Sequence, residues 1–140
     1  MADVIYNSFK SKIMSGAIDL DTDTIKVALV TSTYTPDQDV HDFFDDVTNE
    51  VSGTGYTAGG ATLASVVVSA DNTDNEGVFD AADTTWSTST ITARGAVIYK
   101  STGLASTSPL IAYIDFVSDK SSSAGNFTIQ FSAEGILNLN

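Results

Sequence analysis

The chain has 140 residues, a formal net charge of −12 and no cysteine. Its length suits one domain with its own core, whereas the lack of cysteine excludes disulfides and thiolate metal sites. The shortage of Lys and Arg disfavours nucleic acid and anionic membrane surfaces as partners.

The acidic residues are unevenly distributed. Residues 1–90 hold 15 acidic and three basic side chains, and residues 91–140 hold three of each. Ser and Thr make up about a quarter of the chain, a composition typical of sheet surfaces. No apolar run reaches the ~18 residues of a membrane span, and the first ten residues lack a signal-peptide pattern. We therefore expect a protein made in the cytoplasm.

The first regular pattern lies in residues 3–16, which we predict to be the only convincing helix. Ile5, Phe9 and Ile13 recur every four residues and form one apolar stripe. Asp3 is placed to cap the start of the helix, and Gly16 stands where a helix commonly ends. We treat residues 1–16 as an N-terminal helix or arm of the domain.

Strand patterns dominate the rest of the chain. Alternating or β-branched runs predict strands at 23–32, 61–70, 91–100, 110–117 and 126–132, one or two short strands in 78–90 with Trp86 inward, and a last strand at 135–140. Turn residues predict an irregular segment with a helical turn or two at 35–50, a glycine-rich loop at 52–60 and an acidic turn at 71–77. Seven or eight strands after one helix favour an all-β sandwich or barrel in a single domain, residues 1–140.

Two acidic segments raise the question of calcium binding. Residues 19–24, DLDTDT, begin like a helix–loop–helix calcium loop, but Thr24 and Val30 stand where that loop needs Gly and Glu. Residues 71–77 offer three carboxylates at no recognised spacing. We favour solvated turns over metal sites at both places.

Catalytic interpretations have little support. His41 is the only histidine, and no serine near it or elsewhere has the context of an activated nucleophile. Asp115 and Glu134 are candidates for a carboxylate pair of the kind that hydrolyses glycosides, but paired or exposed strand carboxylates are the more common case. We predict a non-enzymatic protein with no catalytic residues, no metal and no cofactor.

Arg94 is the only arginine of the chain and lies within the strand at 91–100. Simple alternation places Ala93, Gly95 and Val97 on one face of this strand and Arg94 on the other, with Ala96 and Ile98. Asp115 on the following strand is the first candidate for a cross-strand ion pair. The alternative is that Arg94 holds an acidic group of a partner protein.

Three stretches, NSFK…GAIDLDTDTIKVALVTSTYTPDQD, DDVTNEVSGTGYTAGG and STITARGAVIYK…LIAYIDF, carry a family resemblance. They are similar to small virion structural proteins of tailed phages that are encoded beside the major capsid protein, in particular capsid cement (decoration) proteins. The resemblance covers most of the chain. It implies a jelly-roll β-sandwich that is made in the host bacterial cytoplasm and binds the exterior of the virion. There it would act as a homodimer that clamps neighbouring major capsid subunits.

Three residues are the candidates for contact with a partner. We expect Phe9, Arg94 and Tyr56 to contact the partner, and both terminal segments to serve as arms. The alternative function is a tail or receptor-binding module, for example one that binds carbohydrate. It predicts an exposed aromatic platform, for which Tyr34, Tyr56 and Trp86 are the candidates.

Overall fold

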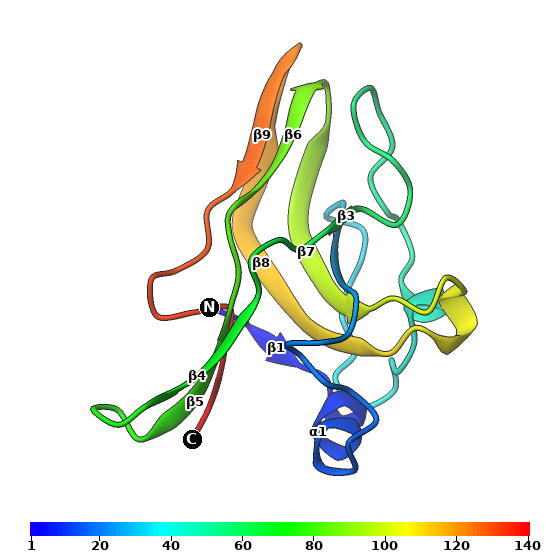
Figure 1. Cartoon of the computed structure of the whole chain (residues 1–140). Coiled ribbons are helices and arrows are strands. Elements are labelled where there is room, and N and C mark those ends of the chain that lie inside the picture. Colours follow the sequence, from blue (N-terminus) through cyan, green and yellow to red (C-terminus); the bar gives the residue numbers. More distant parts are fainter.

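The computed structural model describes all 140 residues and shows antiparallel β-structure with a single α-helix (Figure 1). The predicted all-β class is confirmed. The helices are α1 (Asn7–Met14) and two 3-10 turns, η1 (Phe44–Asp46) and η2 (Ala105–Thr107). The strands are β1 (Val4–Ile5), β2 (Ile25–Val30), β3 (Ala61–Thr62), β4 (Val67–Asp71), β5 (Glu76–Asp80), β6 (Thr84–Ser89), β7 (Thr92–Lys100), β8 (Leu110–Ser121), β9 (Gly125–Ile129) and β10 (Leu137–Leu139).

The strands form three sheets in the orders β1-β8-β7-β2-β3, β10-β5-β4 and β6-β9. The main core lies between one face of the five-stranded sheet and the two smaller sheets. It joins β2, β7 and β8 residues to Phe79 of β5, Trp86 of β6, Phe127 of β9 and Leu137 of β10, all of them buried. The arrangement is therefore a layered β-sandwich-like fold.

The opposite face of the five-stranded sheet is covered by residues 31–50 rather than by a further sheet. Here the rings of Phe44 and Tyr99 stack with centroids 4.1 Å apart, and the hydroxyls of Tyr6 and Tyr34 share a hydrogen bond of 2.9 Å. Burial raises the pKa of the Tyr6 hydroxyl, so it stays protonated. These contacts give the irregular segment a second small core of its own.

Helix α1 is shorter than predicted and begins at Asn7. The preceding residues form β1, which pairs with the free edge of β8, so the ladder supplies backbone hydrogen bonds that a first helical turn would leave unmade. The expected capping role of Asp3 was wrong, since its carboxylate accepts the Asp115 N–H at 2.7 Å. Gly16 ends the helix with φ +75°. No helix in the structure has the length and apolarity needed to cross a bilayer.

Both ends of the chain belong to sheets and do not extend away as arms. The predicted C-terminal strand is present as β10, which pairs with β5, and the Ala2 N–H donates to the Ile136 carbonyl at 3.0 Å. Figure 1 shows the N-terminus near the start of the last strand and the C-terminus at the far end of that strand, beside the β4–β5 hairpin. The predicted strand at 61–70 is split into β3 and β4, because Ser65 between them adopts a φ of +53°.

Candidate interaction surfaces

Arg94 on β7 forms the predicted ion pair with Asp115 on β8. The Arg94 Nε lies 2.8 Å from Asp115 Oδ1, and the same oxygen accepts the Val117 N–H at 2.8 Å. Both side chains remain about one-third exposed. Asp115 is therefore the partner of Arg94 within the chain. The exposed part of the Arg94 guanidinium can still contact a group of another molecule.

The predicted face of Arg94 was wrong because β8 carries a bulge opposite it. Ala93 pairs with Lys120 and Gly95 with Asp115, so residues 116–119 of β8 stand against Arg94 alone. The bulge reverses the alternation: Ala96 and Ile98 face the main core, whereas Gly95 faces the ring of Tyr113. Arg94 consequently lines a shallow cavity of about 320 Å³ with Tyr113 and Pro36.

The Arg94–Asp115 pair predicts a measurable pH dependence. The hydrogen bond from Arg94, followed by that from the Val117 N–H, holds the pKa of Asp115 below its ordinary value of 3.8. The stabilisation is therefore complete above that value and is lost as the pH falls through the lower folded pKa. We expect Asp115→Asn to lose less of its urea midpoint than the wild type between about pH 5 and about pH 2.

The matched control for this pH series is Asp45→Asn, since the Asp45 carboxylate accepts no hydrogen bond within the chain. It removes the same formal charge and should follow the wild-type midpoint as the pH falls. Identical acid profiles for wild type and Asp115→Asn would show that the pair contributes nothing to folding in solution.

Tyr56 uses its hydroxyl inside the protein. It donates to Glu50 Oε1 at 2.7 Å and accepts the Leu29 N–H at 2.9 Å, and Glu50 Oε1 also accepts the Gly59 N–H at 2.6 Å. Burial, together with the bond to Glu50, raises the pKa of Tyr56. The side chain therefore fastens the glycine-rich loop to β2, which is a role distinct from the partner contact predicted for it.

Replacing Tyr56 with phenylalanine should lower the free energy of unfolding by about 1–3 kcal/mol, because the buried Leu29 N–H would lose its acceptor. Urea denaturation followed by tryptophan fluorescence measures this directly, since Trp86 packs beside the Tyr56 ring. If Tyr56→Phe had unchanged stability but bound the partner more weakly, Tyr56 would instead belong to the binding surface.

Phe9 and the predicted aromatic platform are not at the surface. The Phe9 side chain has no exposed area, so its predicted contact with a partner is corrected to a core role. Tyr34 and Trp86 are 4% and 6% exposed, which confirms the inward direction of Trp86 and removes the platform from the surface of this chain. Sequence reasoning missed the burial of Tyr34 because the segment around it has no regular periodicity.

His41 and Asp23 are engaged in local structure. His41 Nδ1 bonds the Tyr34 hydroxyl at 3.1 Å and accepts the Asp37 N–H at 3.2 Å, so it holds residues 31–50 together. Asp23 Oδ2 accepts the Asp19 N–H and pairs with Lys100 Nζ, both at 2.8 Å. No group of three or more His, Cys, Asp or Glu side chains is arranged to hold a metal ion.

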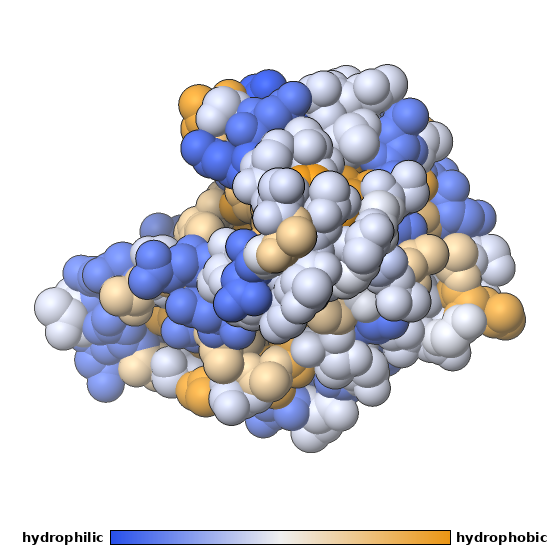
Figure 2. Space-filling view, turned by 90° about the horizontal axis from the view of Figure 1, so that it is seen from above, coloured by the Kyte–Doolittle hydropathy of each residue, from blue (hydrophilic) through white to orange (hydrophobic).

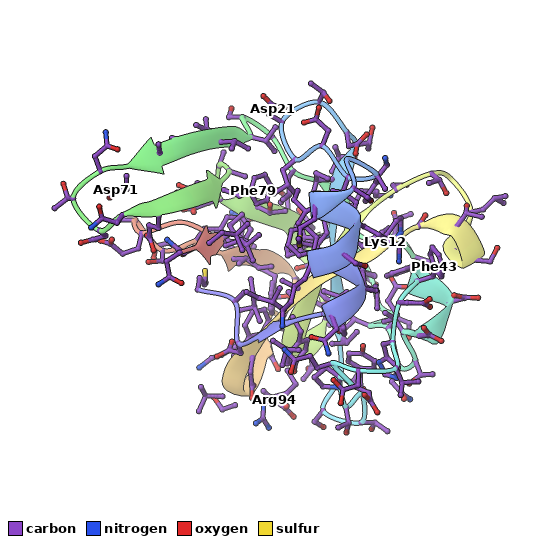
Figure 3. All side chains as sticks on the ribbon, turned by 90° about the horizontal axis from the view of Figure 1, so that it is seen from below. Lys12, Asp21, Phe43, Asp71, Phe79 and Arg94 are labelled. Carbon is purple, nitrogen blue, oxygen red and sulfur yellow. The ribbon has the colours of Figure 1, made fainter.

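The acidic turn predicted at 71–77 joins β4 and β5 into a hairpin, whose exposed position sequence reasoning missed. The hairpin projects from the body of the molecule, and β4 pairs only with β5, so its other edge is open (Figures 1 and 3). Val67 and Val68 on this strand are 54% and 51% exposed. A run of valines ordinarily indicates a buried strand, so this pattern did not predict an exposed one.

An apolar groove of about 350 Å³ lies between this hairpin and the segment that follows α1. Val68 pairs with Phe79, which pairs in turn with Leu137, so one row of side chains runs from the core to the open edge. In Figure 2 the projecting lobe at the left is mainly hydrophilic, with paler and orange atoms along its side. The groove is also lined by Ile13, Ile18, Leu20 and Leu139, together with two acidic residues, Asp19 and Asp21.

No protein-family model, curated protein or solved structure matches this chain. Function is therefore inferred from the sequence and from the surfaces described above. Of these surfaces, the β4 edge combines two adjacent exposed valines with an unpaired strand backbone.

Proposed function

We propose that the chain is a non-enzymatic capsid cement (decoration) protein of a tailed phage. It binds the outer face of the shell and stabilises contacts between major capsid subunits. The structural observation that supports this function best is the open, apolar edge of the β4–β5 hairpin on an otherwise well-packed body. A protein whose task is attachment needs such a surface and no reactive groups.

The chemistry of attachment suits this role. Many copies that bind only the intact shell stabilise it by mass action, in proportion to their concentration above Kd. The net charge of −12 keeps free copies soluble and repels packaged DNA. Jelly-roll connectivity, homodimer formation, a location on the virion exterior and synthesis in the host cytoplasm belong to the same proposal, and the sequence resemblance supports them.

A tail or carbohydrate-binding module is the competing function. Such modules present exposed aromatic rings on which sugars stack, and the sequence offered Tyr34, Tyr56 and Trp86 for this purpose. Because Tyr34 and Trp86 are buried and Tyr56 is bonded to Glu50, we prefer the capsid function.

The test is co-sedimentation of the purified protein with mature shells that lack it. We expect saturation near one copy per major capsid subunit and a higher melting temperature of the decorated shells. Absence of binding, or only a few copies per virion, would contradict the capsid function and favour a tail component.

Arg94 is tested in the same assay. If its guanidinium also holds an acidic group of the shell, Arg94→Ala lowers the number of bound copies while the free chain remains folded. Lys26→Ala provides a control for the loss of one positive charge on a different strand. Unchanged occupancy would leave Arg94 with Asp115 as its only partner.

A further inference from the structure

The backbone of β4 presents hydrogen-bonding groups to its open side. The Phe79 carbonyl accepts the Ile136 N–H at 2.8 Å, so the polar groups of Phe79 point toward β10. Opposed residues of an antiparallel pair alternate between bonded and non-bonded, and Val68 opposes Phe79. The N–H and C=O of Val68, and those of Ala70 two residues on, therefore point away from β5, where the chain supplies no neighbouring strand.

The two faces beside this edge differ in chemistry. Val68 lines the apolar groove, and the alternation of the strand places Ala70 on the same side, where it pairs with Gly77 and Gly77 pairs with Leu139. The opposite face carries Val67, Ser69 and Asp71. A strand added at the edge would thus lay alternate side chains against an apolar groove and against the other, polar face.

The polar face is acidic. It borders a hollow of about 560 Å³ whose charged lining residues are Asp71, Asp80 and Glu134, with no Lys or Arg among the rest. Oδ1 of Asp80 is buried without a hydrogen-bond partner. Figure 3 shows Asp71 near the free end of the hairpin and Phe79 at its base, so the acidic and apolar features lie along one element. Basic side chains are the complement of this face.

We propose that the β4 edge binds an extended segment of a partner protein as an added strand, with apolar and basic side chains alternating along that segment. The inference rests on the proposed function for the identity of the partner, which would be an extended part of the major capsid protein. A second copy fits less well: antiparallel β4–β4 pairing brings another Asp71 to a face that is already acidic.

The first experiment uses defined peptides with the intact chain. The probe is a labelled nine-residue peptide of alternating Val and Lys, and the matched control alternates Val and Asp. We expect saturable binding of the Val–Lys peptide by fluorescence anisotropy, weakened by salt, with shifts of the Val68 and Ala70 amide resonances. Equal binding of both peptides, or of neither, would overturn the proposal.

Substitutions at the edge separate backbone pairing from general charge attraction. Ala70→Pro removes an outward N–H without removing a bond to β5, and it should weaken peptide binding by about tenfold or more. Ala70→Val keeps the N–H and should bind within about twofold of the wild type. Val68→Thr leaves the backbone intact and removes apolar contact in the groove, so it tests the same site if Ala70→Pro fails to fold.

The same variants on shells distinguish the two proposals. Shell binding that is lost in Ala70→Pro and kept in Ala70→Val supports both. Shell binding that is equal in wild type, Ala70→Pro and Val68→Thr overturns the edge site and leaves the cement function standing. Peptide binding at the edge without any shell binding overturns the cement function and leaves the edge site standing. A dimer of the free chain that Ala70→Pro dissociates, with no peptide binding, would assign the edge to a second copy and overturn the proposal.

Discussion

Replacing Phe9 with alanine is expected to lower the free energy of unfolding by about 3–5 kcal/mol, the range for removing a buried aromatic ring. Phe9 is the only fully buried residue of α1 and belongs to the main core. Helix α1 has eight residues, a length that is not stable in water without tertiary contacts. Urea denaturation measures the loss of stability. In hydrogen-exchange experiments on the variant, the backbone amides of α1 should lose their protection before those of the sheets.

The control is Met14→Ala on the same helix. Met14 is 88% exposed, so its truncation should change the free energy of unfolding by no more than about 0.5 kcal/mol. The comparison matters for the binding assay, because reduced shell occupancy of Phe9→Ala would reflect a destabilised fold. A stable Phe9→Ala protein that fails to bind shells would show that Phe9 is exposed in solution, contrary to the structure.

Replacing Gly60 with alanine should cost about 3 kcal/mol or more, from the sum of backbone strain and overpacking. Gly60 has a φ of +73°, and an added Cβ would overlap the Val27 carbonyl oxygen and lie 2.7 Å from the Ala28 Cα. These are backbone atoms of β2, which is fixed between β7 and β3 and cannot move aside. Thermal and urea unfolding of the purified variant measure the effect.

Gly16→Ala isolates the strain from the contact. Gly16 has a similar φ of +75°, but nothing lies within 4 Å of the position of an added Cβ. Its substitution should therefore cost only the backbone strain, about 1–2 kcal/mol. Equal costs at Gly16 and Gly60 would mean that loop 52–60 lies farther from β2 than the structure places it.

The two proposed contacts of the surface are spatially independent. Arg94 and the hairpin tip at Asp71 lie far apart in Figure 3, on different sheets. Substitutions at the two places should therefore combine additively in shell binding if both surfaces contact the partner. If only one surface contributes, the double variant will bind like the corresponding single variant.

The sequence by itself determined the features that depend on local pattern. Period-two alternation predicted the strands around 25–30 and 92–100, and the pairing of consecutive strands β7 and β8 predicted the Arg94–Asp115 contact. Gly16 marked the end of the helix because a residue with positive φ favours glycine. Each of these signals arises from neighbours in the chain or from one hairpin.

The tertiary structure alone decided which residues are exposed and which face they occupy. The bulge at residues 116–119 moved Arg94 to the face of Tyr113. The pairing of β1 with β8 delayed the start of the helix from residue 3, where the sequence pattern placed it, to Asn7. The burial of Tyr34 and the exposure of Val68 depend on segments distant in sequence, 31–50 folding over one sheet and β4 lying at the edge of another. Strand propensity describes a fit to neighbours on a pleated surface, so a sequence read alone cannot distinguish a valine in a core from one at an open edge.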